Sequence, residues 1–148
     1  MIKVFLVLMI TVFFAACDSS NSDNAVVETG VISSFENGSP KVERDYKVVD
    51  GNQLPFFERE YYADGNLLKE GALNNDAKRN GLWKSYYRDG VLWSQGDFIN
   101  GIREGITITY FASGKKYYEG HYTKGRKSGV WKFWNEQVEL VKETDYNN

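Results

Sequence analysis

The stretch GLWKSYYRDG at residues 81–90 returns as GITITYFASG at residues 105–114 and begins a third time as GVWKFW at residues 129–134. Four columns of glycines and aromatic residues keep this period. They are Gly65, Gly90 and Gly114; Gly71, Gly96 and Gly120; Gly81, Gly105 and Gly129; and Tyr62, Tyr87 and Phe111, all spaced 24 or 25 residues apart. A fixed period of this size is typical of repeat arrays, which more often present binding surfaces than house catalytic pockets.

Turn dipeptides divide each unit into two strands. They are Asp64-Gly65, Asp89-Gly90 and Ser113-Gly114 at one turn, and Asn100-Gly101 and Lys124-Gly125 at a second. Glycine supplies the positive backbone angle that such turns need. Each unit is therefore expected to hold two strands, which in the second unit lie around Gly96 and after Gly105. The first unit has one extra residue, which is expected in a loop between Gly71 and Gly81. The predicted fold is all-β, an elongated array of antiparallel β-hairpin repeats of about 24 residues.

Side chains alternate across a strand, so residues two apart share a face. Gly96 shares its face with Phe98, and a glycine beside a large ring indicates close packing by a neighbouring element. In the second strand of the units, one face carries Leu82, Ile106 and Val130 and the other carries Trp83, Thr107 and Trp131. The rings predicted to form a partner-binding surface are Trp83, Tyr87, Trp93, Phe111, Tyr117 and Trp131. The alternative is that these rings pack the core.

The N-terminus predicts an export signal. Residues 1–16 contain Lys3, an apolar run over residues 4–14 broken by Thr11, and two alanines, which is the pattern of a secretory signal peptide. FAAC at residues 14–17 resembles the lipobox of bacterial lipoproteins, with Phe14 where that family usually has Leu. The resemblance implies lipidation of Cys17 and anchoring to a membrane of the bacterial cell envelope, at the outer membrane or a periplasmic face rather than in the cytoplasm. An ordinary signal peptide with a free cysteine is the alternative.

The rest of the chain divides into a tether and a repeat domain. Residues 17–40 begin with the polar run DSSNSDN at residues 18–24 and are expected to be a disordered tether. Residues 41–148 are predicted to form the repeat domain, with a degenerate first unit over residues 31–60 left open and a closing strand near residues 138–144. Cys17 is the only cysteine, so no intramolecular disulfide forms.

The repeat resembles the bacterial variant of the MORN repeat. The segments that carry the resemblance are YYRDG at residues 86–90, GLWKSYY at residues 81–87 and GVWKFW at residues 129–134. It covers about residues 61–134 and implies successive antiparallel β-hairpins in an elongated, twisted sheet. Thr107 departs from the pattern, because it replaces the tryptophan found at Trp83 and Trp131. Proteins with these variant repeats are often described as antitoxin-like, which implies a protein partner.

The sequence contains no signature of catalysis, and we predict no catalytic residue, metal site or cofactor. His121 is the only histidine and falls at a repeat position shared with Ala72 and Asp97, which is typical of a surface residue. A zinc site needs several His or Cys ligands. Acids such as Asp64 and Asp89 precede glycines and are expected to shape turns. The net charge is −2 and basic residues are dispersed, so binding of nucleic acid is not predicted.

Three kinds of partner fit an array of this composition. The first is a protein, because Tyr and Trp are large, fairly rigid and amphipathic side chains. The second is a cell-wall glycan or other polysaccharide, whose sugar faces stack on exposed rings while Asn100, Glu119 and His121 supply hydrogen bonds. The third is a lipid headgroup, as proposed for eukaryotic MORN repeats, which the acidic net charge disfavours. The sequence favours the protein partner.

Overall fold

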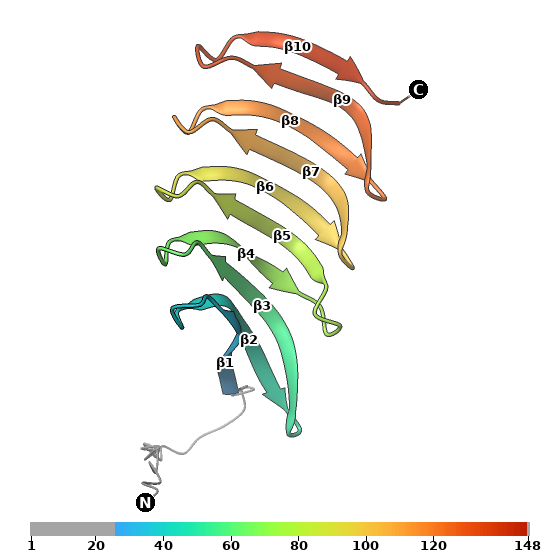
Figure 1. Ribbon diagram of the computed structural model, residues 1–148. Coiled ribbons are helices and arrows are strands. Elements are labelled where there is room, and N and C mark those ends of the chain that lie inside the picture. Colours follow the sequence, from blue (N-terminus) through green and yellow to red (C-terminus); the bar gives the residue numbers. More distant parts are fainter. Residues whose placement is uncertain (1–25, 148) are drawn as a thin grey trace, which may run out of the picture.

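The chain forms one open antiparallel sheet in which ten strands lie side by side in sequence order (Figure 1). The computed structural model describes residues 26–147. The strands are β1 (Val26–Ser34), β2 (Pro40–Val49), β3 (Asn52–Tyr61), β4 (Leu67–Leu73), β5 (Arg79–Tyr86), β6 (Leu92–Ile99), β7 (Ile102–Tyr110), β8 (Lys116–Thr123), β9 (Arg126–Trp134) and β10 (Leu140–Asp145). Within residues 26–147 no helix is long and apolar enough to cross a membrane. The all-β prediction of a hairpin repeat array is confirmed.

The sheet begins earlier than the sequence analysis placed it. Strand β1 pairs antiparallel with β2, so the expected tether of residues 17–40 includes a strand and the boundary at residue 41 falls inside a hairpin. The pairing needs only backbone hydrogen bonds, which a sequence outside the repeat pattern also supplies. Residues 31–60 continue the sheet as parts of β1, β2 and β3, with register shifts in both pairings. The predicted signal peptide, Cys17 and the first part of the tether lie outside the described residues.

Two kinds of turn join the strands, and both follow the predicted turn signals. The two-residue turns Asp50-Gly51, Asn100-Gly101 and Lys124-Gly125 have positive φ at both positions, as type I′ hairpins require. The turns at the opposite ends of the strands are longer. In one of these, the N–H of Tyr87 donates to the carbonyl of Val91, and Gly90 takes a φ of 87°. The extra residue of the first unit lies in the loop between β4 and β5, as predicted.

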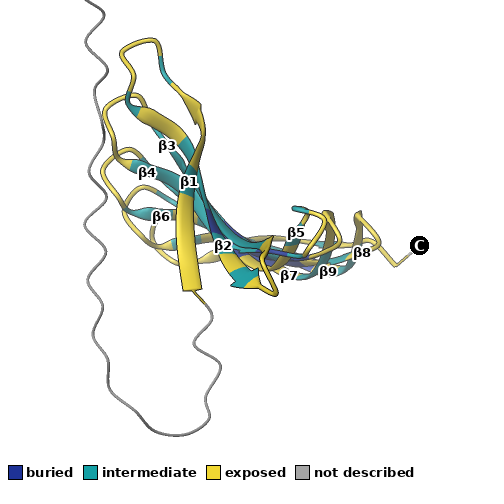
Figure 2. Ribbon diagram, turned by 90° about the horizontal axis from the view of Figure 1, so that it is seen from below, coloured by how far each residue is buried: buried dark blue, intermediate teal, exposed yellow. Residues whose placement is uncertain are grey.

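Gly81, Gly105 and Gly129 lie inside strands, not before them. The turn signals predicted a strand after Gly105, whereas β7 already begins at Ile102. Gly105 has a φ of 85°, and the register with β6 shifts between the pairs that flank it. This glycine therefore forms a β-bulge, and a bulge bends its strand. Figure 2 shows the strands bent, with the buried residues gathered along the bend.

A row of glycines and tryptophans crosses the sheet and forms its core. Gly71 pairs with Trp83, Trp83 with Gly96, Gly96 with Thr107, and Thr107 with Gly120. We call the side that carries this row the ring face. A Cβ added at Gly71 would lie 2.6 Å from Cδ1 of Trp83, and one added at Gly120 would lie 2.7 Å from Cγ of Trp131. Each indole therefore lies directly on the backbone of the neighbouring strand, which is the close packing that the sequence predicted.

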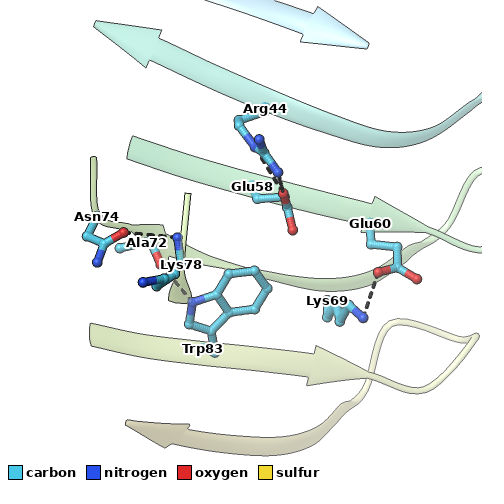
Figure 3. A network of polar contacts seen from close by, with 8 residues as sticks. All are labelled: Arg44, Glu58, Glu60, Lys69, Ala72, Asn74, Lys78 and Trp83. Atoms are coloured by element: carbon cyan, nitrogen blue, oxygen red, sulfur yellow. Dashed lines mark hydrogen bonds and ion pairs between the residues drawn. The ribbon is translucent and has the colours of Figure 1, made fainter. Parts of the chain in front are cut away.

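Polar contacts continue this row toward the N-terminal end (Figure 3). The Trp83 indole N–H donates to the carbonyl of Ala72 at 2.7 Å, which fixes the ring over β4. One strand further on, Glu58 takes the place in the row that a tryptophan holds elsewhere, and it forms an ion pair with Arg44. The sheet thus replaces stacked rings by a salt bridge where the sequence repeat fades.

Val138 carries a backbone conformation that its side chain disfavours. Its φ is 67°, which is strained for a β-branched residue, and its side chain is exposed. We expect Val138→Gly to raise the free energy of unfolding by about 1 kcal/mol, because glycine adopts this conformation without strain. Urea denaturation followed by circular dichroism measures the change. Val141→Gly is the matched control: Val141 is equally exposed but lies in β10, so glycine there is expected to lower stability, and the same effect at both positions would contradict the explanation.

Candidate functional site

Two of the six predicted binding rings are buried. Trp83 is 4% exposed and Trp131 is 2% exposed, so neither offers a ring to a partner. One side of each indole lies against a glycine of the next strand, and a cation lies over each ring: Arg79 Cζ is 4.3 Å from the Trp83 centroid and Lys127 Nζ is 4.3 Å from that of Trp131. The prediction of these two residues as surface rings is wrong, because a glycine on the neighbouring strand leaves room for each of these two indoles to lie on the sheet.

The other four predicted rings form two pairs at the ends of hairpins. Tyr87 and Trp93 have centroids 6.3 Å apart, and Phe111 and Tyr117 have centroids 4.8 Å apart. Trp93 is 46% exposed and Tyr117 is 42% exposed, whereas Tyr87 and Phe111 are half-buried. The Tyr87 hydroxyl donates to the carbonyl of Tyr110 at 2.9 Å and so ties two units together. Binding by these four rings stays a prediction.

The polar groups proposed to accompany sugar stacking already have partners within the chain. The Asn100 side-chain oxygen accepts a hydrogen bond from Asn74 at 2.7 Å, and Glu119 forms an ion pair with Lys116 at 2.6 Å. His121 is exposed, as predicted, and its Nδ1 lies 3.0 Å from the Ser128 hydroxyl. Across residues 26–147 no cluster of three or more His, Cys, Asp and Glu residues is arranged to hold a metal ion.

The face opposite the rings carries a row of alternating charge, and we call it the ladder face. Successive strands contribute directly paired residues to this row. From β2 to β10 these are Glu43, Arg59, Glu70, Lys84, Gln95, Ile108, Glu119, Lys132 and Glu143. Opposite charges on neighbouring strands stabilise the sheet modestly. The uncharged pair Gln95 and Ile108 leaves a neutral stretch in the middle of the ladder face.

Tyrosine hydroxyls bind two of the ladder carboxylates. Tyr86 donates to Glu70 at 2.8 Å, and Tyr61 donates to Glu43 at 2.7 Å. Burial of each phenol, together with its hydrogen bond to a carboxylate, raises the pKa of Tyr61 and of Tyr86 from 10.0 to about 12. A phenol with a raised pKa stabilises the fold fully below pH 10, and that stability is lost as the pH rises toward 12.

We therefore expect the free energy of unfolding to fall between pH 10 and pH 12, and Tyr86→Phe to make this fall shallower. Urea denaturation at several pH values, with ultraviolet absorbance of the phenolate as a second readout, measures it. Tyr62→Phe is the control, because the Tyr62 hydroxyl donates to the carbonyl of Tyr86 at 2.9 Å rather than to a carboxylate. An unchanged pH slope in Tyr86→Phe would contradict the assignment.

Exposed aliphatic side chains recur along the ladder face, where Leu82 pairs with Asp97 and Ile106 pairs with His121 on the strands between them. Leu82, Ile106 and Val130 occupy the same repeat position on β5, β7 and β9, each one residue before the row of rings. Ile99 and Ile102 pair with each other at the end of the hairpin formed by β6 and β7. All five are 46–59% exposed. We call these five residues the aliphatic strip.

A shallow hollow adjoins the aliphatic strip. It is lined by Phe57, Glu70, Gly71, Leu82 and Lys84, from β3, β4 and β5. Leu82 therefore belongs both to the aliphatic strip and to the hollow. Leu82, Ile106 and Val130 share one face, as predicted, but they are not among the predicted binding residues, because that prediction rested on aromatic side chains. Their 24-residue spacing was the signal that could have found them.

Comparison with known proteins identifies the repeat. Residues 79–100 and 103–124 match the MORN repeat variant, and each match covers one hairpin: β5 with β6, and β7 with β8. The comparison with curated proteins found no match. A crystal structure of the GtfA/B complex bound to UDP and GlcNAc is similar over 86% of this chain and 25% of that chain, with 12% sequence identity and a TM-score of 0.46. This likeness is too distant to carry an argument, whereas the MORN-variant match establishes a repeat of a kind that serves binding.

Proposed function

We propose that this chain is a non-catalytic binding module of the bacterial cell envelope, anchored through Cys17, whose aliphatic strip binds a protein partner. The observation that carries the proposal is the exposure of five aliphatic side chains on one face of a single-layered sheet. Apolar side chains exposed at repeated positions along one face favour an interaction site, because leaving them in water costs free energy. A partner that covers the strip removes this cost, and an antitoxin-like or immunity-like interaction is one form of such binding.

The composition of the strip favours a protein over a neutral glycan. Leucine, isoleucine and valine offer neither a flat ring on which a sugar stacks nor a hydrogen bond to a hydroxyl. They resemble the apolar centre of a protein interface, and the Lys84 and Glu70 side chains nearby suit its polar rim. Glycan binding remains the alternative, and the exposed rings of Trp93 and Tyr117 favour it.

Membrane anchoring is supported by the FAAC motif at residues 14–17 and by the placement of Cys17 before the sheet. An anchored module would hold its partner at the envelope rather than free in solution. We expect Cys17→Ser to move the protein from the membrane fraction to the soluble fraction, because the acyl chains that hold it are lost. Fractionation of cells followed by immunoblotting measures this, and a variant that stays in the membrane fraction would remove the anchor from the proposal.

Affinity capture tests the binding function. The tagged full chain is captured from gently solubilised envelopes of its native cells, and the proteins retained are identified by mass spectrometry. We expect one protein enriched by the wild type and lost with Leu82→Ser plus Val130→Ser, which reduces the aliphatic strip without adding charge. The control is Trp93→Ser plus Tyr117→Ser, which removes the exposed rings. Loss of the captured protein with the control variant alone would place the site at the exposed rings. Capture of the same protein by all variants would overturn the aliphatic strip as the site.

A further inference from the structure

Three cations form a row on the ring face. Arg79, Arg103 and Lys127 are spaced by 24 residues and lie at the starts of β5, β7 and β9. Each lies over aromatic rings: Arg79 over Trp83 at 4.3 Å, Arg103 over Phe98 at 5.2 Å, and Lys127 over Trp131 at 4.3 Å, measured to the ring centroids. We call these three residues the cation row.

Within residues 26–147 the cation row has no carboxylate partner. In the part of the chain that the structure describes, none of the three cations lies within 4.0 Å of a carboxylate oxygen. Seven salt bridges between other residues do form there. Their polar contacts are weak: Arg103 Nη1 donates to the Thr107 hydroxyl at 3.5 Å, and Lys127 Nζ donates to the Tyr146 hydroxyl at 3.5 Å. The positive charge on this face is therefore free to meet an external anion, unlike the alternating charges of the ladder face.

The cations are also held in place before any ligand arrives. Stacking on a ring confines each side chain and adds a favourable cation–π interaction. The backbone is held as well, because the Gly101 N–H donates to the Arg79 carbonyl at 2.8 Å and the Gly125 N–H donates to the Arg103 carbonyl at 2.9 Å. Binding through such fixed groups loses less conformational entropy than binding through mobile lysines.

The spacing of the row selects among polyanions. The cations lie on alternate strands, so neighbours are separated by about 10 Å, twice the distance between adjacent strands. Duplex DNA carries a charge about every 1.7 Å along its axis, so three cations would neutralise a small share of the phosphates they span. A sparsely charged polymer, with one acidic group in each disaccharide, matches the row charge for charge. The ring faces are covered by the cations themselves, which leaves no platform for bases to stack.

We propose that the cation row formed by Arg79, Arg103 and Lys127 binds a linear anionic polysaccharide that carries carboxylates at intervals of about 10 Å. The polymer lies across β5, β7 and β9, and each carboxylate meets one cation. This site lies on the face opposite the aliphatic strip, so the module can hold a glycan and a protein partner together. It is independent of the proposed protein-binding site.

The test uses hyaluronate oligosaccharides, which have one carboxylate per disaccharide, and the purified full chain. Isothermal titration calorimetry measures affinity. Tryptophan emission, recorded in a Trp93→Phe plus Trp134→Phe background so that only Trp83 and Trp131 under two of the cations contribute, reports contact with the row. We expect binding that weakens with salt, a loss of about threefold for Arg103→Gln, and a loss of about thirtyfold when all three cations become Gln.

Two controls decide the result. Lys84→Gln plus Lys132→Gln removes two cations from the ladder face and is expected to leave affinity unchanged. Hyaluronate whose carboxylates have been reduced to alcohols is expected not to bind. Equal binding by wild type and the triple variant, equal binding of the reduced polymer, or preferential binding of single-stranded DNA or of phosphatidylglycerol vesicles over hyaluronate would each overturn the proposal.

Discussion

Gly120→Ala is expected to lower the free energy of unfolding by about 4 kcal/mol, close to the cost of deleting a buried tryptophan. The new methyl would lie 2.7 Å from Cγ of Trp131, a ring that is 2% exposed and lies on the glycine itself. Neither group can yield cheaply: the glycine belongs to the backbone of β8, and the indole is bounded by Tyr118, Tyr122 and Tyr146. The ring must leave its site, and its buried area is lost. Urea denaturation followed by circular dichroism measures the change.

Gly96→Ala is the matched control, because Gly96 holds the same repeat position opposite Thr107 instead of a tryptophan. Its added Cβ would lie 3.2 Å from the Thr107 hydroxyl oxygen, so a small shift relieves the contact. We expect a cost of about 1 kcal/mol. Trp131→Thr in the Gly120→Ala background copies the Gly96→Ala variant, in which an alanine lies opposite Thr107, and is expected to restore part of the stability. Equal costs at Gly96 and Gly120 would contradict the role given to the indole.

The repeat period was enough to predict the hairpin array, since turn glycines and strand patterns reinforce one another in each unit. It also predicted close packing of a neighbouring element on the glycines of this column, which the indoles lying on Gly71 and Gly120 confirm. The bulge at Gly105 could not be predicted, because a glycine with positive φ serves a turn and a bulge equally well. Strand β1 was missed for a related reason: it carries none of the repeating columns, and antiparallel backbone pairing makes few demands on side chains.

The candidate site could not be predicted in full, because it depends on which side chains are buried. In a sheet of a single layer, the sequence pattern does not show which face is covered. Trp83 and Leu82 are neighbours with apolar side chains, yet Trp83 is buried on a glycine while Leu82 is exposed on the other face. In a two-layered fold both faces of a strand can be covered, and an aliphatic residue at a repeating position is then part of a core. The absence of a second layer over residues 26–147 is what turns Leu82, Ile106 and Val130 into a surface.

Ile106→Asp is expected to weaken binding of the captured partner by at least a hundredfold. Ile106 lies on β7 at the centre of the aliphatic strip and is 59% exposed, so the substitution costs little folding stability. In the complex the side chain is covered by apolar groups, and an aspartate there would be a buried charge without a partner. Loss of the apolar contact adds to that cost. Calorimetric titration of the purified partner measures the change, with circular dichroism to establish that the variant is folded.

Val141→Asp separates a local effect from a general one. Val141 is also 59% exposed and also lies in a strand, but it belongs to β10, outside the aliphatic strip. Both variants add one negative charge, so they change the net charge and its salt-dependent attraction to the partner equally. We expect Val141→Asp to bind within about threefold of the wild type, a margin typical of charges at the rim of an interface. Equal losses for the two variants would show that added charge alone weakens binding, and the aliphatic strip would then lose its role as the centre of the interface.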